Sequence, residues 1–177
     1  LQIVKKEENR DITTSEEVIK QLKKWCEQDL KITPLKTLQG ILWQKGYQNG
    51  ELLGHVFDDV PISLDKWKKN GKKMGVFSSG SVNAQKLLFS HSVKGNLSHF
   101  FTHHFDTNIG PKRAAETYAV IAKEIALSAD RILFLSDVIE ELAAAEKVGM
   151  KTIQIKREGN MEDWKQSVAD FSEIVLI

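Results

Sequence analysis

The feature that most constrains the fold is a short apolar run that ends in an acidic residue. Residues 131–136 read RILFLS and are followed by Asp137. A run this short and this apolar is typical of a strand buried on both faces of a parallel sheet. Similar runs at 73–78, 100–105 and 151–155 alternate with helical patterns. This alternation predicts an α/β fold built on a parallel sheet.

Helical patterns fill the stretches between these strands and the end of the chain. We expect helices over 61–70, 81–89, 112–126 and 138–148, and from Asp163 onward. Each tryptophan falls on an apolar stripe. The tryptophans are therefore expected in the core: Trp25, Trp43, Trp67 and Trp164.

Residues 1–54 differ from the rest because they show helical patterns and no strong strand. We expect one helix over 15–30, capped by Ser15, and a second helix that opens at Pro34. The second helix carries one apolar face: Leu35, Leu38, Ile41 and Leu42. We therefore divide the chain into a helical segment at 1–54 and an α/β core at 55–177.

Composition excludes several classes of function. The chain has 177 residues, with Lys+Arg 25 and Asp+Glu 24, so its net charge of +1 does not favour nucleic acid as the main partner. No apolar run is long enough to cross a membrane, and the N-terminal residues lack the apolar stretch of a secretory signal. The single cysteine, Cys26, cannot form an internal disulfide, which favours a reducing, cytoplasmic setting.

Polar residues stand where open α/β sheets place functional groups, at strand ends and helix starts. Residues 78–81 (SSGS) join a strand to a helix and could bind a phosphate or simply form a capped turn. Asp137 could bind Mg²⁺ or cap the next helix. Lys112 could neutralise a phosphate or be an ordinary surface lysine. Together they supply the hydroxyl, cation and metal-binding carboxylate of a phosphoryl-transfer site without its nucleophile.

Other polar residues give weaker signals. His99 and His103 have the spacing of a helical metal pair, but the pattern around them is extended, which favours ordinary surface or core histidines. His91 follows the helix at 81–89 and could line the site. Glu141 lies one helical turn after Asp137 and could support the site or be a solvated helix residue.

Several segments resemble the enolase-phosphatase E1 family of the haloacid dehalogenase (HAD) superfamily. The most specific are VFSSGSVNAQKLLFSHS (76–92) and HFDTNIGPK (104–112), and ILFLSDVIEELAAAEKVGM (132–150) also matches. Shorter matches complete the resemblance: LQGILW (38–43), GYQNGELLGHVFDDVP (46–61) and KREGN (156–160). The resemblance implies a HAD-like Rossmannoid core, with residues 1–54 as the C-terminal part of a helical cap.

The resemblance also implies a role for each polar site. Ser78 would hold the transferring phosphoryl group, and Ser79 would bind substrate. Lys112 would bind substrate and act in catalysis by neutralising charge, and Asp137 would ligate Mg²⁺. The implied enzyme is a cytoplasmic monomer of L-methionine salvage. It would enolise and dephosphorylate a small phosphate monoester, 2,3-diketo-5-methylthiopentyl-1-phosphate, to the aci-reductone.

The chain departs from the family in one respect. The family nucleophile lies in a DxExT motif after an apolar strand, and these residues contain no such motif; Asp11 has Thr13 two positions later, where an acidic residue is required. We therefore expect that the chain lacks the first core strand, which would lie between the strands ending at Ser78 and Ser136. Two alternatives remain: another HAD phosphomonoesterase, and a non-catalytic phosphate-binding or regulatory protein.

We predict that these 177 residues alone do not hydrolyse phosphate monoesters, because the nucleophile motif is missing from them. Phosphate release by the purified chain with and without Mg²⁺ tests this. Mg²⁺-dependent turnover that copurifies with the chain through successive columns would contradict the prediction.

Overall fold

The computed structural model describes residues 14–28, 30, 32–157 and 164–176. Contacts divide the chain into two compact units, residues 1–52 and 53–177. The boundary falls close to the division expected at residue 54. That the first unit belongs to a cap over the second stays a prediction.

The first unit contains helix α2 (Ser15–Glu27), which begins with a capping box. The hydroxyl of Thr14 accepts from the Glu17 backbone N–H at 3.2 Å, and the Glu17 carboxylate accepts from the Thr14 backbone N–H at 3.1 Å. This reciprocal pair satisfies two N–H groups that the helix leaves open. Thr14 therefore caps the helix, and the prediction of Ser15 as the cap is wrong.

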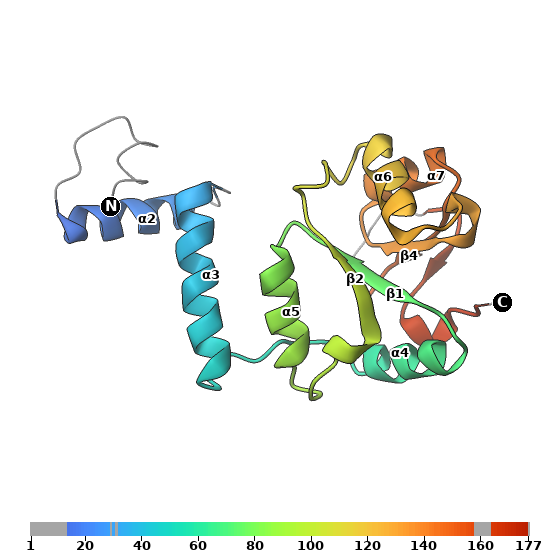
Figure 1. Cartoon of the computed structure of the whole chain (residues 1–177), viewed down its shortest axis with the longest axis horizontal. Coiled ribbons are helices and arrows are strands. Elements are labelled where there is room, and N and C mark those ends of the chain that lie inside the picture. Colours follow the sequence, from blue (N-terminus) through green and yellow to red (C-terminus); the bar gives the residue numbers. More distant parts are fainter. Residues whose placement is uncertain (1–13, 29, 31, 158–163, 177) are drawn as a thin grey trace. The chain divides into compact units, whose positions relative to one another are not determined.

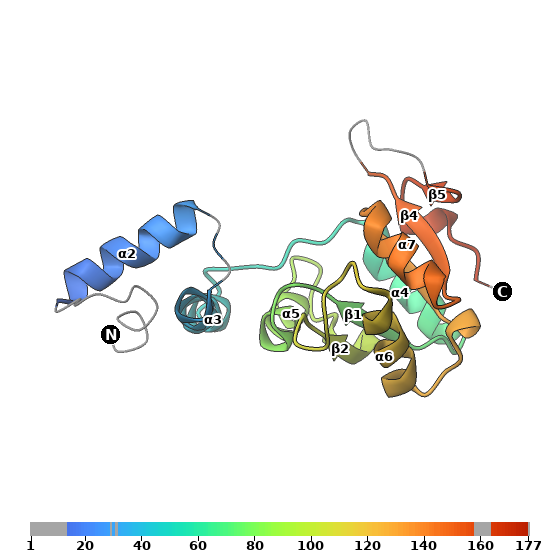
Figure 2. The ribbon, with the colours of Figure 1, turned by 90° about the horizontal axis from the view of Figure 1, so that it is seen from above.

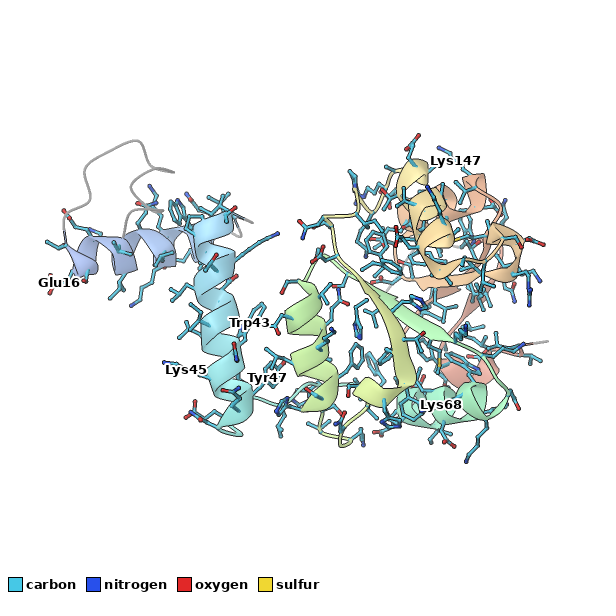
Figure 3. All side chains as sticks on the ribbon, viewed as in Figure 1. Glu16, Trp43, Lys45, Tyr47, Lys68 and Lys147 are labelled. Atoms are coloured by element: carbon cyan, nitrogen blue, oxygen red, sulfur yellow. The ribbon has the colours of Figure 1, made fainter. Side chains whose placement is uncertain are left out.

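Helix α3 (Thr33–Gln48) has Pro34 in its first turn, as predicted. Its N-terminal part forms a small apolar cluster with α2, made of Leu22, Trp25 and Leu35. The predicted apolar face does not stay buried beyond this cluster, because Ile41 is 50% and Leu42 is 55% exposed. Trp43, expected in the core, is 42% exposed and stands out from α3 (Figure 3). Among the described residues, α2 covers only the first turns of α3.

The second unit alternates helices with short strands (Figure 1). In chain order its elements are α4 (Asp59–Lys69), β1 (Met74–Phe77), α5 (Val82–Ser90), η1 (Ser98–Phe100), β2 (Phe101–Phe105), α6 (Ala115–Ile125), η2 (Ala129–Arg131), β3 (Leu133–Ser136), α7 (Ile139–Lys147), β4 (Lys151–Ile155), β5 (Ser167–Val168) and η3 (Phe171–Glu173). The alternation predicted from the sequence is confirmed.

The strands form two separate parallel sheets. Strand β1 pairs with β2 (Figure 2), and β3 pairs with β4, which in turn pairs with β5. Among the described residues, β1 and β3 each have one edge without a partner strand. The predicted parallel α/β architecture is confirmed. That a further strand belongs between β1 and β3 stays a prediction.

Two apolar clusters join the sheets where hydrogen bonds do not. The first cluster consists of Leu64, Trp67, Leu97, Phe100, Ile153, Ile155 and Ile174. The second cluster consists of Tyr118, Ile121, Ala122, Ala144, Ala145 and Met150.

Strand β3 contributes side chains to both clusters because alternate side chains of a strand point to opposite faces. Leu133 and Leu135 pack on the first cluster, and Phe134 packs on the second. Strand β1 does the same, with Met74 on the first cluster and Phe77 on the second. Each cluster therefore receives side chains from both sheets, so a common core fixes the sheets relative to each other.

The C-terminal segment contains the short strand β5 and the 3-10 turn η3 and no α-helix among its described residues, so the helix predicted from Asp163 onward is wrong; Asp163 itself lies outside the described residues. The Gln154 backbone N–H donates to the Gln166 carbonyl at 2.9 Å, and the Lys156 N–H donates to the Val168 carbonyl at 2.9 Å. The open edge of β4 thus recruits this backbone, and strand pairing overrides the local helical pattern.

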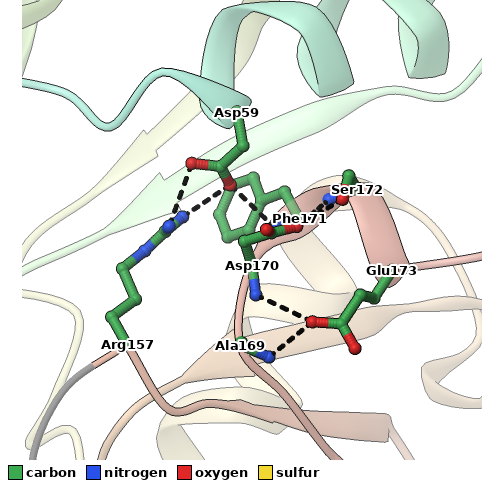
Figure 4. Close-up of polar contacts among 7 residues, drawn as sticks. All are labelled: Asp59, Arg157, Ala169, Asp170, Phe171, Ser172 and Glu173. Carbon is green, nitrogen blue, oxygen red and sulfur yellow. Dashed lines mark hydrogen bonds and ion pairs between the residues drawn. The ribbon is translucent and has the colours of Figure 1, made fainter.

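The Asp59 carboxylate at the start of α4 binds both the segment after β4 and the C-terminal segment (Figure 4). The guanidinium of Arg157 donates to both carboxylate oxygens of Asp59, at 2.9 and 2.7 Å. The Phe171 backbone N–H donates to the same carboxylate at 2.8 Å, and the Phe57 ring lies 4.0 Å from the guanidinium. Burial alone would raise the pKa of Asp59, but these hydrogen bonds and the positive charge outweigh it and lower the pKa below 3.8.

We predict that Asp59→Asn lowers the free energy of unfolding by about 2 kcal/mol at pH 7, because Arg157 loses its charged partner. A carboxyl whose pKa is lowered by folding stabilises the protein above its unfolded pKa and loses that effect as the pH falls through the folded pKa. The difference should therefore shrink below about pH 4. Urea unfolding at pH 7 and pH 3 measures it.

The matched control is Asp65→Asn, which removes an exposed ion pair with Lys69 on the same helix. Exposed pairs contribute little, so the control should change stability by less than about 0.5 kcal/mol. Equal effects of the two substitutions at pH 7 would contradict the prediction.

Candidate functional site

The loop after β1 presents a hydroxyl and backbone N–H groups. The Ser78 backbone N–H donates to the Phe105 carbonyl at 3.2 Å, and the Ser78 hydroxyl oxygen accepts from the Gly80 N–H at 3.2 Å. Ser81, predicted as the first residue of the helix, instead caps α5 by accepting from the Ala84 N–H at 3.2 Å. Because Ser78 uses its oxygen as an acceptor, its hydroxyl hydrogen can be donated to a ligand. Ser79 is exposed beside it.

Lys112 lies in a turn before α6 and not inside the helix, which corrects the predicted helix start. Two side chains of α6 stabilise this turn by donating hydrogen bonds to its backbone carbonyls. The Tyr118 hydroxyl donates to the Lys112 carbonyl at 2.6 Å, and the Thr117 hydroxyl donates to the Pro111 carbonyl at 2.8 Å. Gly110 has φ +147°, and a Cβ there would lie 2.3 Å from the Thr117 hydroxyl oxygen. The turn therefore requires glycine at this position.

The Lys112 ammonium forms an ion pair with Glu141, with 2.8 Å between Nζ and Oε2. The side chains are 25% and 9% exposed, so the pair is mostly shielded from water. The same Glu141 oxygen accepts from the Ser136 hydroxyl at 2.9 Å, and Lys112 Nζ lies 5.7 Å from the centre of the Phe77 ring. Lys112 is thus placed between the end of β1 and the end of β3, and it is not an ordinary surface lysine.

The Glu141 carboxylate also affects the pKa of a buried side chain, the phenol of Tyr118. Burial raises the pKa of Tyr118, and the negative charge of Glu141 raises it further. Tyr118 therefore stays protonated and keeps its hydrogen bond to the Lys112 turn. Glu141 is buried, so the alternative of a solvated helix residue is wrong. That Glu141 supports a functional site stays a prediction.

Asp137 follows β3 with its side chain exposed. Helix α7 has no side-chain cap, and the Val138 N–H instead donates to the Ser136 hydroxyl at 3.1 Å. The alternative reading of Asp137 as a helix cap is therefore wrong. Within the described part of the chain, no hydrogen bond or ion pair engages the Asp137 carboxylate, which leaves it open to a ligand.

The residues present suit a hard cation only in part. In residues 14–28, 30, 32–157 and 164–176, no three His, Cys, Asp or Glu side chains gather in a group that could hold a metal. Glu141 is already engaged by Lys112 and Ser136. One open carboxylate at Asp137 fits Mg²⁺, which commonly takes one or two carboxylates and completes its shell with water and phosphate oxygens.

The histidines do not form a metal site. His99 Nδ1 lies 3.0 Å from the Asn96 carbonyl, and His103 Nδ1 lies 2.9 Å from the Thr102 hydroxyl. Burial lowers the pKa of His104, and the positive charges of nearby groups lower it further. His91 is the C-terminal cap of α5, whereas the Ser78 loop lies at the N-terminal end of this helix. The suggestion that His91 lines the site is therefore wrong.

Ser78, Lys112 and Asp137 are thus brought to the carboxyl ends of β1 and β3. The connection runs through their neighbours: Phe77 contacts Lys112, and Lys112 is joined through Glu141 to Ser136, which precedes Asp137. The sequence did not single out Tyr118 as a contact of this turn, because its helical spacing signals only a core residue.

Comparisons with known proteins identify the family. An enolase-phosphatase E1 of Pseudomonas aeruginosa is 48% identical over 161 residues, which cover 91% of this chain and 72% of the relative. One from Shewanella piezotolerans is 46% identical over 172 residues, covering 96% and 75%. The chain belongs to the enolase-phosphatase E1 family. It spans 61% of a Drosophila pseudoobscura member that is 47% identical, and no family model matches it.

Solved structures agree with the family. The UTR4 protein of Saccharomyces cerevisiae is 32% identical with a TM-score of 0.81, over 92% of this chain and 77% of that one. A HAD phosphatase from Thermococcus onnurineus is 16% identical with a TM-score of 0.63, over 84% and 66%, and shows the shared HAD fold. Enolase-phosphatases and HAD phosphatases generally use a divalent metal. No helix among the described residues has the length and apolar character needed to cross a membrane.

We predict that Glu141→Gln makes Lys112 more reactive toward an amine-acylating reagent, because the substitution removes the carboxylate that holds the ammonium. Loss of a shielded, charge-assisted hydrogen bond should raise the labelling rate about tenfold. Peptide mass spectrometry measures labelling at Lys112.

Glu140→Gln is the matched control, because Glu140 is exposed and lies 3.7 Å from exposed Arg113. It should leave the Lys112 labelling rate unchanged. Equal labelling of Lys112 in both variants would show that Glu141 does not hold it.

Proposed function

We propose that the protein containing this chain is a divalent-metal-dependent enolase-phosphatase. It would enolise 2,3-diketo-5-methylthiopentyl-1-phosphate and then remove its phosphate to give the aci-reductone of L-methionine salvage. The observation that carries the proposal is the placement of Lys112 between the ends of β1 and β3, in a chain 48% identical to a curated enolase-phosphatase E1.

The residues of this chain would bind the phosphoryl group. The Ser78 hydroxyl donates to a phosphoryl oxygen while the Gly80 N–H keeps the Ser78 oxygen in place. The Lys112 ammonium neutralises negative charge that develops during phosphoryl transfer. Ser79, exposed in the same loop, contacts the rest of the substrate.

Asp137 would hold the metal, for which we propose Mg²⁺. When bound, Mg²⁺ neutralises phosphoryl oxygens and polarises the diketone for enolisation. Glu141 binds Lys112 and the Ser136 hydroxyl through the same oxygen, Oε2, so we assign it a supporting role. Its contribution is to hold Lys112 beside the Asp137 loop.

The proposal also covers the cellular compartment, the oligomeric state and the partners of the protein. The substrate is a small phosphate ester, and we propose a cytoplasmic monomer with no nucleic-acid or membrane partner. Cys26 is an exposed free thiol, which suits a reducing compartment.

We predict that Asp137→Asn raises the Mg²⁺ concentration needed for half-maximal activity, and that Lys112→Ala lowers kcat about 10²–10³-fold. Both are made in the protein expressed from its complete reading frame. Phosphate release from the diketo phosphate is measured across a Mg²⁺ titration. Unchanged Mg²⁺ dependence in Asp137→Asn would remove Asp137 from the metal site.

Matched controls use residues of the same types close to the same elements. Asp130 is exposed and precedes β3, whereas Asp137 follows it, and Lys123 is exposed in the last turn of α6. Asp130→Asn and Lys123→Ala should leave activity unchanged. Other phosphate monoesters are assayed in parallel, and a higher kcat/KM on one of them would favour a different HAD phosphomonoesterase.

A further inference from the structure

Gln85 is a buried polar residue that the sequence did not single out. It lies in α5 and is 5% exposed. Its side-chain amide nitrogen donates to the Gly80 carbonyl at 3.0 Å and to the Phe105 carbonyl at 2.7 Å. The Phe105 carbonyl also accepts from the Ser78 backbone N–H at 3.2 Å. One side chain therefore binds the Gly80 end of the Ser78–Gly80 loop and the β2 carbonyl that also accepts from the Ser78 end.

The orientation of the Gln85 amide follows from its partners. The Gly80 and Phe105 carbonyls can only accept, so the amide nitrogen must face them. The amide oxygen then faces His104, whose Nδ1 lies 3.2 Å away and must carry the hydrogen. All of the polar atoms of this buried side chain are thus used, and the amide is held in one orientation.

We propose that Gln85 is a positioning residue for phosphate, which acts by fixing the Ser78–Gly80 loop against the end of β2. This inference rests on the proposed function of that loop. Without the Gln85 amide, the Ser78 N–H contact to Phe105 is the remaining direct tie between the loop and β2 among the described hydrogen bonds. The Ser78 hydroxyl and the nearby N–H groups would then be free to move away from the phosphoryl oxygens.

The physical reason is that a binding group contributes fully only when its position is set before the ligand arrives. Small displacements of a hydrogen-bond donor weaken its interaction with an anion, and supporting hydrogen bonds prevent them. Gln85 supplies two such bonds from a rigid helix. Asp106 adds a further contact at the same place, since its carboxylate accepts from the Val82 N–H at 3.3 Å.

The test compares Gln85→Met with Phe89→Leu in the protein expressed from its complete reading frame. Gln85→Met keeps the length of the side chain and removes both donors. Phe89 packs on the first cluster, with its ring centre 4.4 Å from that of Phe101, so Phe89→Leu weakens the same helix through packing alone. The inhibition constant of inorganic phosphate and the KM of the substrate are measured at a temperature where both variants are folded.

We expect Gln85→Met to raise the phosphate inhibition constant and the KM about tenfold, with a smaller change in kcat. Phe89→Leu should lower the melting temperature and leave both constants within about twofold. Equal constants in the two variants would overturn the positioning role. Absence of phosphate inhibition and of turnover in the unsubstituted protein would instead overturn the proposed function, and with it this inference.

A second measurement uses the unsubstituted protein and so does not depend on whether Gln85→Met folds. Inorganic phosphate is titrated while the ¹H–¹⁵N resonances of the Gly80 backbone and the Gln85 side chain are followed. We expect both to shift with the same apparent Kd. A Gly80 shift with the Gln85 side-chain resonances unmoved would contradict the proposal.

Discussion

The arrangement at the strand ends depends on one ion pair, between Lys112 and Glu141. Its 2.8 Å contact joins the turn before α6 to the first turns of α7, and Ser136 binds the same carboxylate. A mostly buried ammonium without a partner would be unfavourable, so the pair fixes where these two segments meet. The ends of β1 and β3 are thereby held close although no backbone hydrogen bond joins the two sheets in the described part of the chain.

The core explains why this arrangement is possible without a continuous sheet. Alternate residues of β3 reach both apolar clusters, and β1 contributes Met74 to one and Phe77 to the other. Burial of apolar surface has no required direction, so it can align two sheets that hydrogen bonding leaves separate. Packing thus sets the positions of the strands that carry the polar loops. Hydrogen bonds from the Gln85 amide to Gly80 and from the Tyr118 hydroxyl to Lys112 then fix the backbone of these loops.

Much of the fold could be predicted from the sequence, because strands such as 133–136 and their following helices carry strong local patterns. Lys112 and Asp137 could also be proposed, since strand ends are a known place for function. Gln85 could not be found this way: a glutamine in a helix is unremarkable until its contacts with Phe105 and His104, about 20 residues away, are known. The prediction of a C-terminal helix was wrong for a similar reason, because this segment pairs with the edge of β4, which precedes it in the chain. The prediction that Trp43 lies in the core was wrong, because an apolar pattern on one helix does not reveal how much of that helix a neighbouring helix covers.

The Asp59–Arg157 contact has a consequence for the order in which the protein assembles. It links residues 98 positions apart, so a long loop must close before the two groups can meet. Neighbouring pairs such as β3 and β4 need far shorter closures and can form earlier. We therefore expect the pair to contribute little to the rate of folding and to act mainly on the rate of unfolding. Together with the Phe171 N–H bond to the same carboxylate, it would slow the release of the C-terminal segment from α4.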